Sequence, residues 1–213
     1  MGTLIYPNIT YSKNITKDNV YLSVSVQELG DGYYYYTVEA HWMSMPSYRG
    51  IDSLGVCADE TSIINETKTG WISYDENIYE VGLLGKGDII DSNPIKQDLS
   101  DLSTVISGDW QGVGVQFELP KNKSPFNSDA WAFVEYSSLV VHLEFKAKLT
   151  FWEEPTSFNV IGSYHHSTIS YTIKPTLSMQ NKSGTMAIAI SENSETIPII
   201  AELDNPIDYI PTP

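Results

Sequence analysis

The stretch Val20–Trp42, VYLSVSVQELGDGYYYYTVEAHW, decides the fold of this chain. Apolar and polar residues alternate in it with a period of two, as they do along a strand that buries one face. Gly30-Asp31-Gly32 interrupts the alternation and supplies the positive φ angles that a tight hairpin needs. We therefore predict an antiparallel hairpin with its core-facing residues at Val20, Leu22, Val24, Val26, Tyr34, Tyr36, Val38, Ala40 and Trp42.

The same alternation recurs downstream and predicts further strands. They are expected at Gln111–Leu119, Leu139–Phe151, Asn159–Ile173, Thr185–Ile190 and Thr196–Leu203. The two longest, Leu139–Phe151 and Asn159–Ile173, exceed the common five or six residues and suggest bent strands that pass between two sheets. The sequence thus predicts an all-β protein, an antiparallel β-sandwich of the jelly-roll kind.

Helix is expected at one place at most. Pro94 suits a first helical turn, and Ile95, Leu99, Leu102 and Ile106 follow at helical spacing, so a short helix near 95–106 is predicted. The polar, turn-rich stretch 85–103 is interpreted as a long loop carrying that helix. We expect one domain over 1–213, with an extended C-terminal arm at 204–213, where three prolines occur.

Charge and composition exclude several classes of function. The 213 residues carry 27 acidic and 12 basic side chains, a formal net charge of −15. Such a field repels nucleic acid and anionic membranes. No apolar run approaches the roughly 18 residues that span a bilayer. Cys57 is the only cysteine, so an internal disulfide is excluded, and its apolar surroundings favour a small buried side chain.

The beginning of the chain bears on its habitat. Met1-Gly2 leads directly into sequence with folded character, without a cationic region or an apolar leader core. Two interpretations remain open. The chain is made without export, as virion proteins are, or it belongs outside a bacterial cell and its leader has been removed.

Metal binding has one candidate type. His165 and His166 are adjacent and point to opposite faces of a strand, so a shared zinc ion is not expected. Calcium prefers hard oxygen ligands from surface loops. Its candidate ligands are Asp88, Asp91 and Asn93 in one segment and Asp75 and Asn77 in another. The same residue types also simply favour turns.

Aromatic residues offer a candidate contact surface: Tyr33, Tyr35, Trp71, Tyr74, Trp110 and Trp152. Three uses remain open. Large rings form subunit or partner contacts, they pave sheet faces because of their β propensity, or they stack on sugar rings. A protein partner or a second copy of the chain is the favoured use, with carbohydrate as the alternative.

One stretch carries a family resemblance. Trp42–Asp52, WMSMPSYRGID, resembles a Trp-x-x-Met-Pro-x-Tyr-Arg-x-x-Asp stretch of uncharacterised secreted proteins of Gram-positive bacteria. The resemblance implies an extracellular habitat and no activity. Within it, Arg49 and Asp52 are predicted to form a structural pair across the turn.

No motif indicates a specific chemistry. We predict a non-enzymatic structural or partner-binding module, extracellular or on a virion, that works through its sheet faces and its terminal arms, Thr3–Tyr6 and 204–213. A calcium-assisted carbohydrate-binding module is the first alternative. A hydrolase with a carboxylate pair is the second, although with 27 acidic residues such a pair is easily found by chance.

Overall fold

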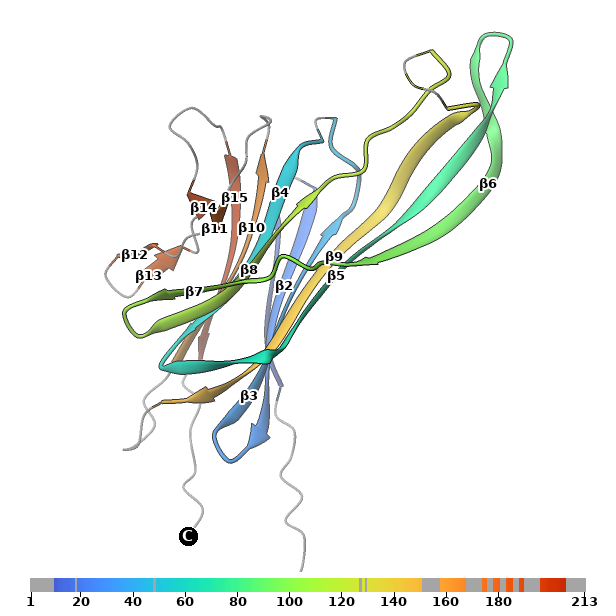
Figure 1. Ribbon diagram of the computed structural model, residues 1–213. Coiled ribbons are helices and arrows are strands. Elements are labelled where there is room, and N and C mark those ends of the chain that lie inside the picture. The colour runs from blue at the N-terminus through green and yellow to red at the C-terminus, as the bar shows by residue number, and fades with distance from the viewer. Residues whose placement is uncertain are drawn as a thin grey trace, which may run out of the picture.

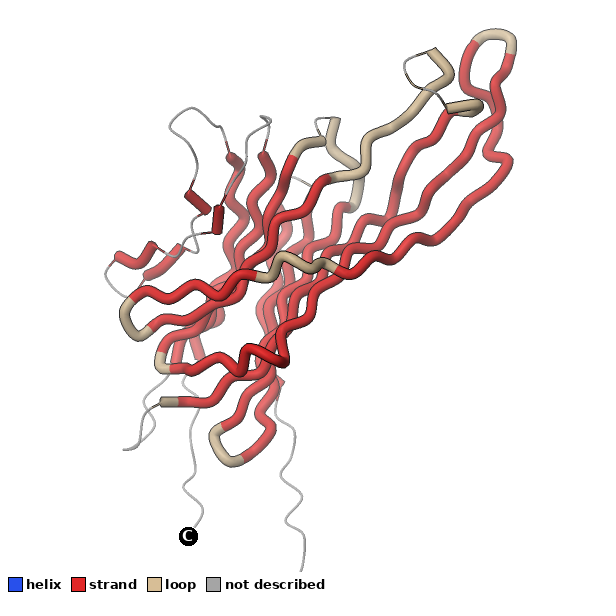
Figure 2. Tube along the Cα trace, in the orientation of Figure 1, coloured by secondary structure: helices blue, strands red, loops and turns tan. Residues whose placement is uncertain are grey.

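The protein was analysed as a computed structural model. It describes residues 10–17, 19–47, 49–126, 128, 130–150, 158–167, 174–175, 178–180, 183–185, 188–189 and 196–205. Over these residues the chain is all-β, and no helix occurs among them (Figure 2). The predicted fold class is confirmed: two antiparallel sheets pack face to face as a sandwich.

The larger sheet has six strands in the order β1-β2-β3-β9-β5-β6, all antiparallel. Their bounds are β1 Thr10–Lys17, β2 Val20–Gly30, β3 Tyr33–Trp42, β5 Thr61–Gly82, β6 Gly85–Asp98 and β9 Phe133–Leu149. The smaller sheet has the order β15-β10-β4-β8-β7. Its strands are β4 Ile51–Asp59, β7 Ser103–Ser107, β8 Trp110–Glu118, β10 Phe158–Ser167 and β15 Thr196–Asn205. Two short pairs, β11 Lys174–Pro175 with β14 Ile188–Ala189 and β12 Ser178–Gln180 with β13 Ser183–Thr185, complete the described strands.

The hairpin predicted from Val20–Trp42 is confirmed as β2 and β3. Val24 pairs with Val38, and the register holds from Val20 opposite Trp42 to Glu28 opposite Tyr34. All nine predicted core residues are buried. Gly30, Asp31 and Gly32 have positive φ angles of 88°, 54° and 75°. The turn therefore adopts the backbone conformation for which its residues were singled out.

The two sheets approach each other closely at Gly162 of β10. A Cβ atom there would lie 3.0 Å from Val24 Cβ and 3.1 Å from Val38 Cγ2, on the facing sheet. Even a methyl group at this position would require Val24 and Val38 to shift by a few tenths of an ångström. Glycine thus allows this close packing of the two layers.

A buried polar network joins the sheets at one end of the core. Asp52 of β4 is fully buried and accepts a hydrogen bond from the Tyr164 hydroxyl, and His166 Nδ1 lies 3.0 Å from both of its carboxylate oxygens. Trp42 Nε1 donates to the Tyr164 hydroxyl over 2.7 Å from the opposite sheet. These partners satisfy a carboxylate whose burial would otherwise be costly.

Three strands extend well beyond the sandwich (Figure 1). β5 pairs with β9 from Thr61 opposite Leu149 to Tyr79 opposite Phe133, and β6 follows β5 along its other side. The half of this ribbon near Ile72 covers the core, whereas the half toward Gly82 projects away from it (Figure 1). We call the projecting half the arm.

The segment 85–103 corrects the sequence interpretation. It forms strand β6 through Asp98 rather than a loop, and the expected helix is absent because Ile95 lies opposite Tyr74 in a strand pair and Ser103 begins β7. Pro94 is accommodated because β6 is the edge strand, where a missing N–H breaks no ladder bond. Leu99 and Leu102 pack against the core as the chain passes from one sheet to the other.

The strands predicted at Gln111–Leu119, Leu139–Phe151, Asn159–Ile173 and Thr196–Leu203 are confirmed where the structure describes them. The strand predicted at Thr185–Ile190 is not found as one element, because Thr185 ends β13 and Ile188–Ala189 form β14, which pair with different strands. Val113, Val115, Phe117 and Leu119 are buried as expected, and so are Leu139 to Ala147 at every second position. Phe151, 168–173, Thr3–Tyr6 and most of the tail 204–213 lie outside the described residues. Among the residues that are described, none belongs to a helix capable of crossing a membrane.

Candidate functional site: the arm and its inner groove

The outer face of the six-stranded sheet carries a continuous network of polar contacts. Glu39 of β3 contacts His41 and lies 3.0 Å from His142 Nδ1, and His142 Nε2 lies 2.8 Å from a Glu144 carboxylate oxygen. Thr69 Oγ1 donates to Glu144 over 2.7 Å. The network ties β3, β9 and β5 together across their outer surface.

Both carboxylates in this network are held in the ionised form. Burial raises the pKa of Glu39, but hydrogen bonds from His142 and His41 outweigh it, so the pKa lies below its ordinary value. Glu144 behaves alike: burial raises its pKa, and hydrogen bonds from Tyr35, His142 and Thr69 lower it further than burial raises it.

The predicted aromatic surface is partly assembled here, yet its rings are engaged. His142 stacks on Trp71 with ring centroids 4.9 Å apart, and Lys96 Nζ lies 4.0 Å from the same ring. The two neighbours come from β9 and β6, on either side of β5, so both faces of Trp71 are covered. Lys148 Nζ lies 5.3 Å from the Tyr33 ring centroid, and Tyr35 hydrogen-bonds Glu144.

The other aromatic candidates lie elsewhere. Tyr74 faces the inner side of the arm and packs edge-on against Tyr136. Trp110 is buried in a small cluster with Cys57 and Ile161 on the other sheet. Trp152 lies outside the described residues. The structure therefore does not gather the six rings into one surface.

The calcium candidates lie on paired strands rather than in loops, which corrects that part of the prediction. Asp75 is opposite Pro94, and Asp91 is opposite Ile78. The Asp91 carboxylate accepts hydrogen bonds from Ser92 N and Asn93 Nδ2, and Asn77 contacts Ser92 and Ser137. Asp88 lies farther along β6. Among the described residues, no three His, Cys, Asp or Glu side chains are grouped to hold a metal ion.

The predicted pair of Arg49 and Asp52 is replaced by two separate sets of contacts. Arg49 donates to Pro120 O over 2.8 Å and to Asn122 Oδ1 over 2.5 Å, while Asp52 is held in the buried network. The described ion pairs include none between the two residues. Arg49 Nε also donates to Pro46 O over 3.2 Å, so Arg49 links its own loop to the segment after β8.

Cys57 is buried, as the sequence predicted. Burial raises the pKa of its thiol to about 12, so the thiolate is disfavoured at neutral pH.

The free end of the arm is rich in exposed apolar side chains. Leu83 and Leu84 form the turn between β5 and β6 and are exposed to 102% and 101%. Other large apolar residues are exposed on the same strands and on the connection 119–132, which runs from β8 to β9 beside the arm (Figure 1). We call these residues the arm end: Val81, Leu83, Leu84, Ile89, Ile90, Phe126 and Trp131.

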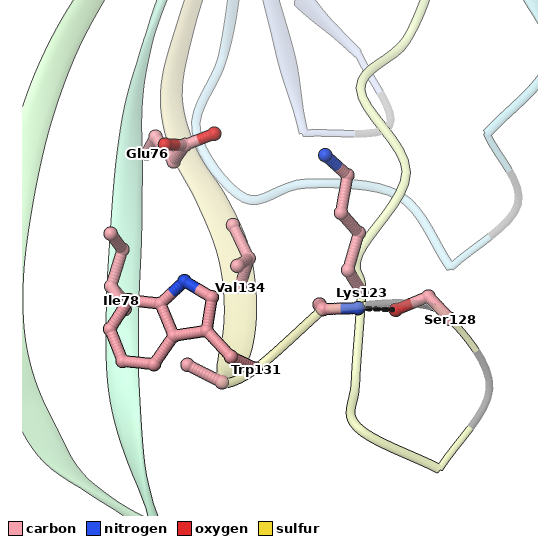
Figure 3. A pocket seen from close by; sticks show the side chains of 8 residues that line it. Glu76, Ile78, Lys123, Ser128, Trp131 and Val134 are labelled. Carbon is pink, nitrogen blue, oxygen red and sulfur yellow. Dashed lines mark hydrogen bonds between the residues drawn. The ribbon is translucent and has the colours of Figure 1, made fainter.

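A groove lies between the inner side of the arm and the connection 119–132. Its outer part is a hollow of about 460 Å³ lined by Ile78, Val134, Trp131, Glu76 and Lys123, among others. Figure 3 shows Glu76 on the arm and Lys123 on the connection, on opposite walls, with Trp131 and Ile78 farther out. Lys123 and Val134 exchange two backbone hydrogen bonds of 2.9 Å, which fix the connection to β9.

A second hollow of about 360 Å³ continues the groove toward the core, and Lys123 lines both. Tyr74, Tyr136 and Gln97 lie in it. Gln97 Nε2 donates to the Tyr74 hydroxyl over 3.3 Å, and the Tyr136 hydroxyl donates to Glu76 over 3.3 Å. Burial and the nearby Glu76 charge raise the pKa of Tyr136 to about 12, so its hydroxyl remains a donor. We call the two hollows together the inner groove.

Sequence reasoning missed the arm end and most of the groove. One signal was available: Leu83-Leu84 stands between Gly82 and Gly85, where turn chemistry favours polar residues. Glu76, Lys123 and Trp131 had no comparable signal, because strand pairing alone brings them together.

Comparisons with known proteins give little further guidance. No family model matches the chain, and no curated protein matches its sequence. Among solved structures, a chain described as a pore forming protein is similar at 11% identity and a TM-score of 0.33, over 92% of this chain and 91% of that one. This similarity is too weak to assign a family or a function.

Proposed function

We propose that this chain is a non-enzymatic binding module that acts outside the cell or on a virion and attaches to neutral lipid surfaces through the arm end. The gathering of exposed apolar side chains at the tip of a projecting ribbon carries the proposal. Soluble proteins rarely leave such clusters uncovered unless they bind something.

Stability of the monomer does not explain the two leucines. Each buried leucine side chain contributes about 1.5 to 3 kcal/mol, and Leu83 and Leu84 contribute none of this while they face water. Polar residues would close the same turn with better solubility. A partner that covers the tip would bury both leucines and gain this free energy on binding.

Shape favours a lipid surface over a protein pocket. The tip is convex and stands clear of the body, so it can enter the boundary between headgroups and acyl chains without distortion (Figure 1). Trp131 and Phe126 are exposed on the neighbouring connection, and aromatic side chains favour this boundary.

Charge favours a neutral surface outside the cytoplasm. The chain has a net charge of −15, and the cytoplasmic leaflet carries anionic lipids that would repel it. The resemblance of Trp42–Asp52 to secreted bacterial proteins supports the same habitat. The outer sheet face is a poorer contact surface, because its rings already have partners.

The test is sedimentation of the protein with phosphatidylcholine vesicles. We expect the wild-type chain to bind and the double variant Leu83→Asp/Leu84→Asp to bind at least about tenfold more weakly, since two charges replace the inserted groups. Ile106→Asp is the matched control, because Ile106 is 64% exposed on β7, outside the arm. Equal binding by the double variant, or no binding by the wild type, would refute the proposal. Capture of a protein instead of vesicles would favour the partner contact that the sequence suggested.

A further inference from the structure

The inner groove exists because β5 and β9 extend beyond the smaller sheet that covers their inner face. Ile72 of β5 and Leu139 of β9 lie in the core, but farther along the arm the connection 119–132 is all that covers the same face among the described residues. The connection is held in place by Arg49 at Pro120 and Asn122 and by the Lys123–Val134 bridge. The groove is therefore preformed rather than dependent on a ligand.

Rings and hydrogen-bonding groups share its lining. Trp131, a residue that is 75% exposed, borders the outer hollow, and the perpendicular pair Tyr74 and Tyr136 borders the inner one. Glu76, Gln97 and Lys123 lie among these rings. Flat rings beside fixed polar groups match ligands that have C–H faces and many hydroxyls.

A peptide fits this lining less well. An extended peptide gains affinity by adding to a free strand edge, but β5 is paired with β9 on one side and β6 on the other. The backbone N–H and C=O groups of a peptide in the groove would find only a few side chains as hydrogen-bond partners. An amphipathic helix needs a continuous apolar groove, and Glu76 and Lys123 interrupt it.

The charges of the groove lining favour neutral sugars over charged ones. The two hollows contribute two carboxylates, Glu76 and Glu118, and two ammonium groups, Lys121 and Lys123, so the lining is balanced. A strongly acidic or basic chain would meet as much repulsion as attraction. We propose that the inner groove binds a neutral oligosaccharide, with one sugar unit on Trp131 and another beside Tyr74 and Tyr136.

This site is separate from the lipid contact of the arm end, although Trp131 borders both. Glu76 and Gln97 belong to the groove alone, and Leu83 and Leu84 belong to the tip alone. Variants can therefore separate the two activities.

The experiment is a screen of the full chain on an array of neutral and acidic oligosaccharides, supplemented with short chitin and cellulose oligomers. Calorimetry then measures the affinity of the best neutral ligand. We expect Trp131→Ala and Glu76→Gln each to weaken it about tenfold, the loss of one stacking contact or one charge-assisted hydrogen bond. Trp71 lies on β5, as Glu76 does, but on its outer face, so Trp71→Ala should leave the affinity unchanged. The double variant Leu83→Asp/Leu84→Asp should also leave the affinity unchanged.

Three outcomes would overturn the proposal. They are no retention of any neutral sugar, equal affinity of wild type and Trp131→Ala, and loss of binding in Trp71→Ala as well. Trp131 is mostly exposed, so its removal should preserve the fold, and circular dichroism and the melting temperature check this. Vesicle binding by Glu76→Gln should stay at the wild-type level, which keeps a failure here distinct from a failure of the lipid proposal.

Discussion

Strands β5 and β9 pass through two different surroundings, and the comparison between them explains how this protein is built. In the body, Leu139, Val141, Leu143 and Phe145 alternate with outward-facing residues such as His142 and Glu144 and are fully buried under the second sheet. In the arm, the same face carries Glu76 and Ile78 and meets only a thin connection. Both halves are paired antiparallel, with shifts of register between Ile64 and Thr69 and between Ser73 and Asp75.

The difference shows that strand pairing and core formation are separable. The backbone ladder and cross-strand pairs extend the ribbon beyond the sandwich, while side-chain burial is confined to the part with an opposing layer. Stability should therefore concentrate in the body, and the arm is free to carry binding surfaces.

The largest expected effect is the loss of the buried carboxylate in the body. Asp52→Ala removes the acceptor for the Tyr164 hydroxyl and the partner of His166 at a site without solvent. We expect a loss of about 3 kcal/mol in the free energy of unfolding. Urea denaturation followed by tryptophan fluorescence measures it.

Asp88→Ala on β6, in the exposed arm, is the control and should change stability by less than about 0.5 kcal/mol. Similar losses in the two variants would mean that body and arm do not differ in the way proposed.

A smaller effect is expected from acid, on the outer face of the body. The pKa of Glu39 is lower in the folded chain than its ordinary value of 4.5. Its stabilising contribution is therefore present above pH 4.5 and is lost as the pH falls through the folded pKa. We expect the free energy of unfolding of wild type to exceed that of Glu39→Gln by about 1 kcal/mol at neutral pH. This difference should disappear as the pH falls and Glu39 becomes protonated.

Denaturation curves of both proteins across this pH range provide the measurement. A gap that stays constant into acid, or one that widens, would show that the carboxylate is not held by His41 and His142 as the structure has it.

The smallest effect on stability is expected at the arm end. Leu83→Asp/Leu84→Asp should leave the free energy of unfolding within about 0.5 kcal/mol of wild type, because neither side chain is buried. The same denaturation assay checks this. A loss comparable to that of Asp52→Ala would mean that the tip packs against something in the free protein.

Sequence patterns predicted the parts of the fold that obey local rules. The alternation from Val20 to Trp42 predicted a hairpin, its turn and its buried face, and Leu139 to Ala147 predicted a core strand. The segment 85–103 was misread because Ile95, Leu99, Leu102 and Ile106 fall at helical spacing by coincidence. β6 pairs with β5 in a hairpin but is mostly exposed, so its sequence lacks the apolar–polar alternation of a strand that buries one face.

The candidate site was less predictable for the same reason. Tyr33, Tyr35 and Trp71 were expected to form a contact surface, but Lys148 lies over Tyr33, and Lys96 and His142 lie over Trp71. Tyr35 hydrogen-bonds Glu144. Arg49 was paired with the nearby Asp52, whereas it bonds Pro46 O in its own loop and two acceptors 71 and 73 residues farther along the chain.

By itself, the sequence determined that this chain forms antiparallel strands with one buried face, because residues at every second position of a strand share a face. The net negative charge likewise follows from composition alone. Only the tertiary structure decided which strands lack a covering layer, and hence where the groove and the exposed tip lie. Those features depend on the relative lengths of strands that meet in space, which residue order alone does not specify.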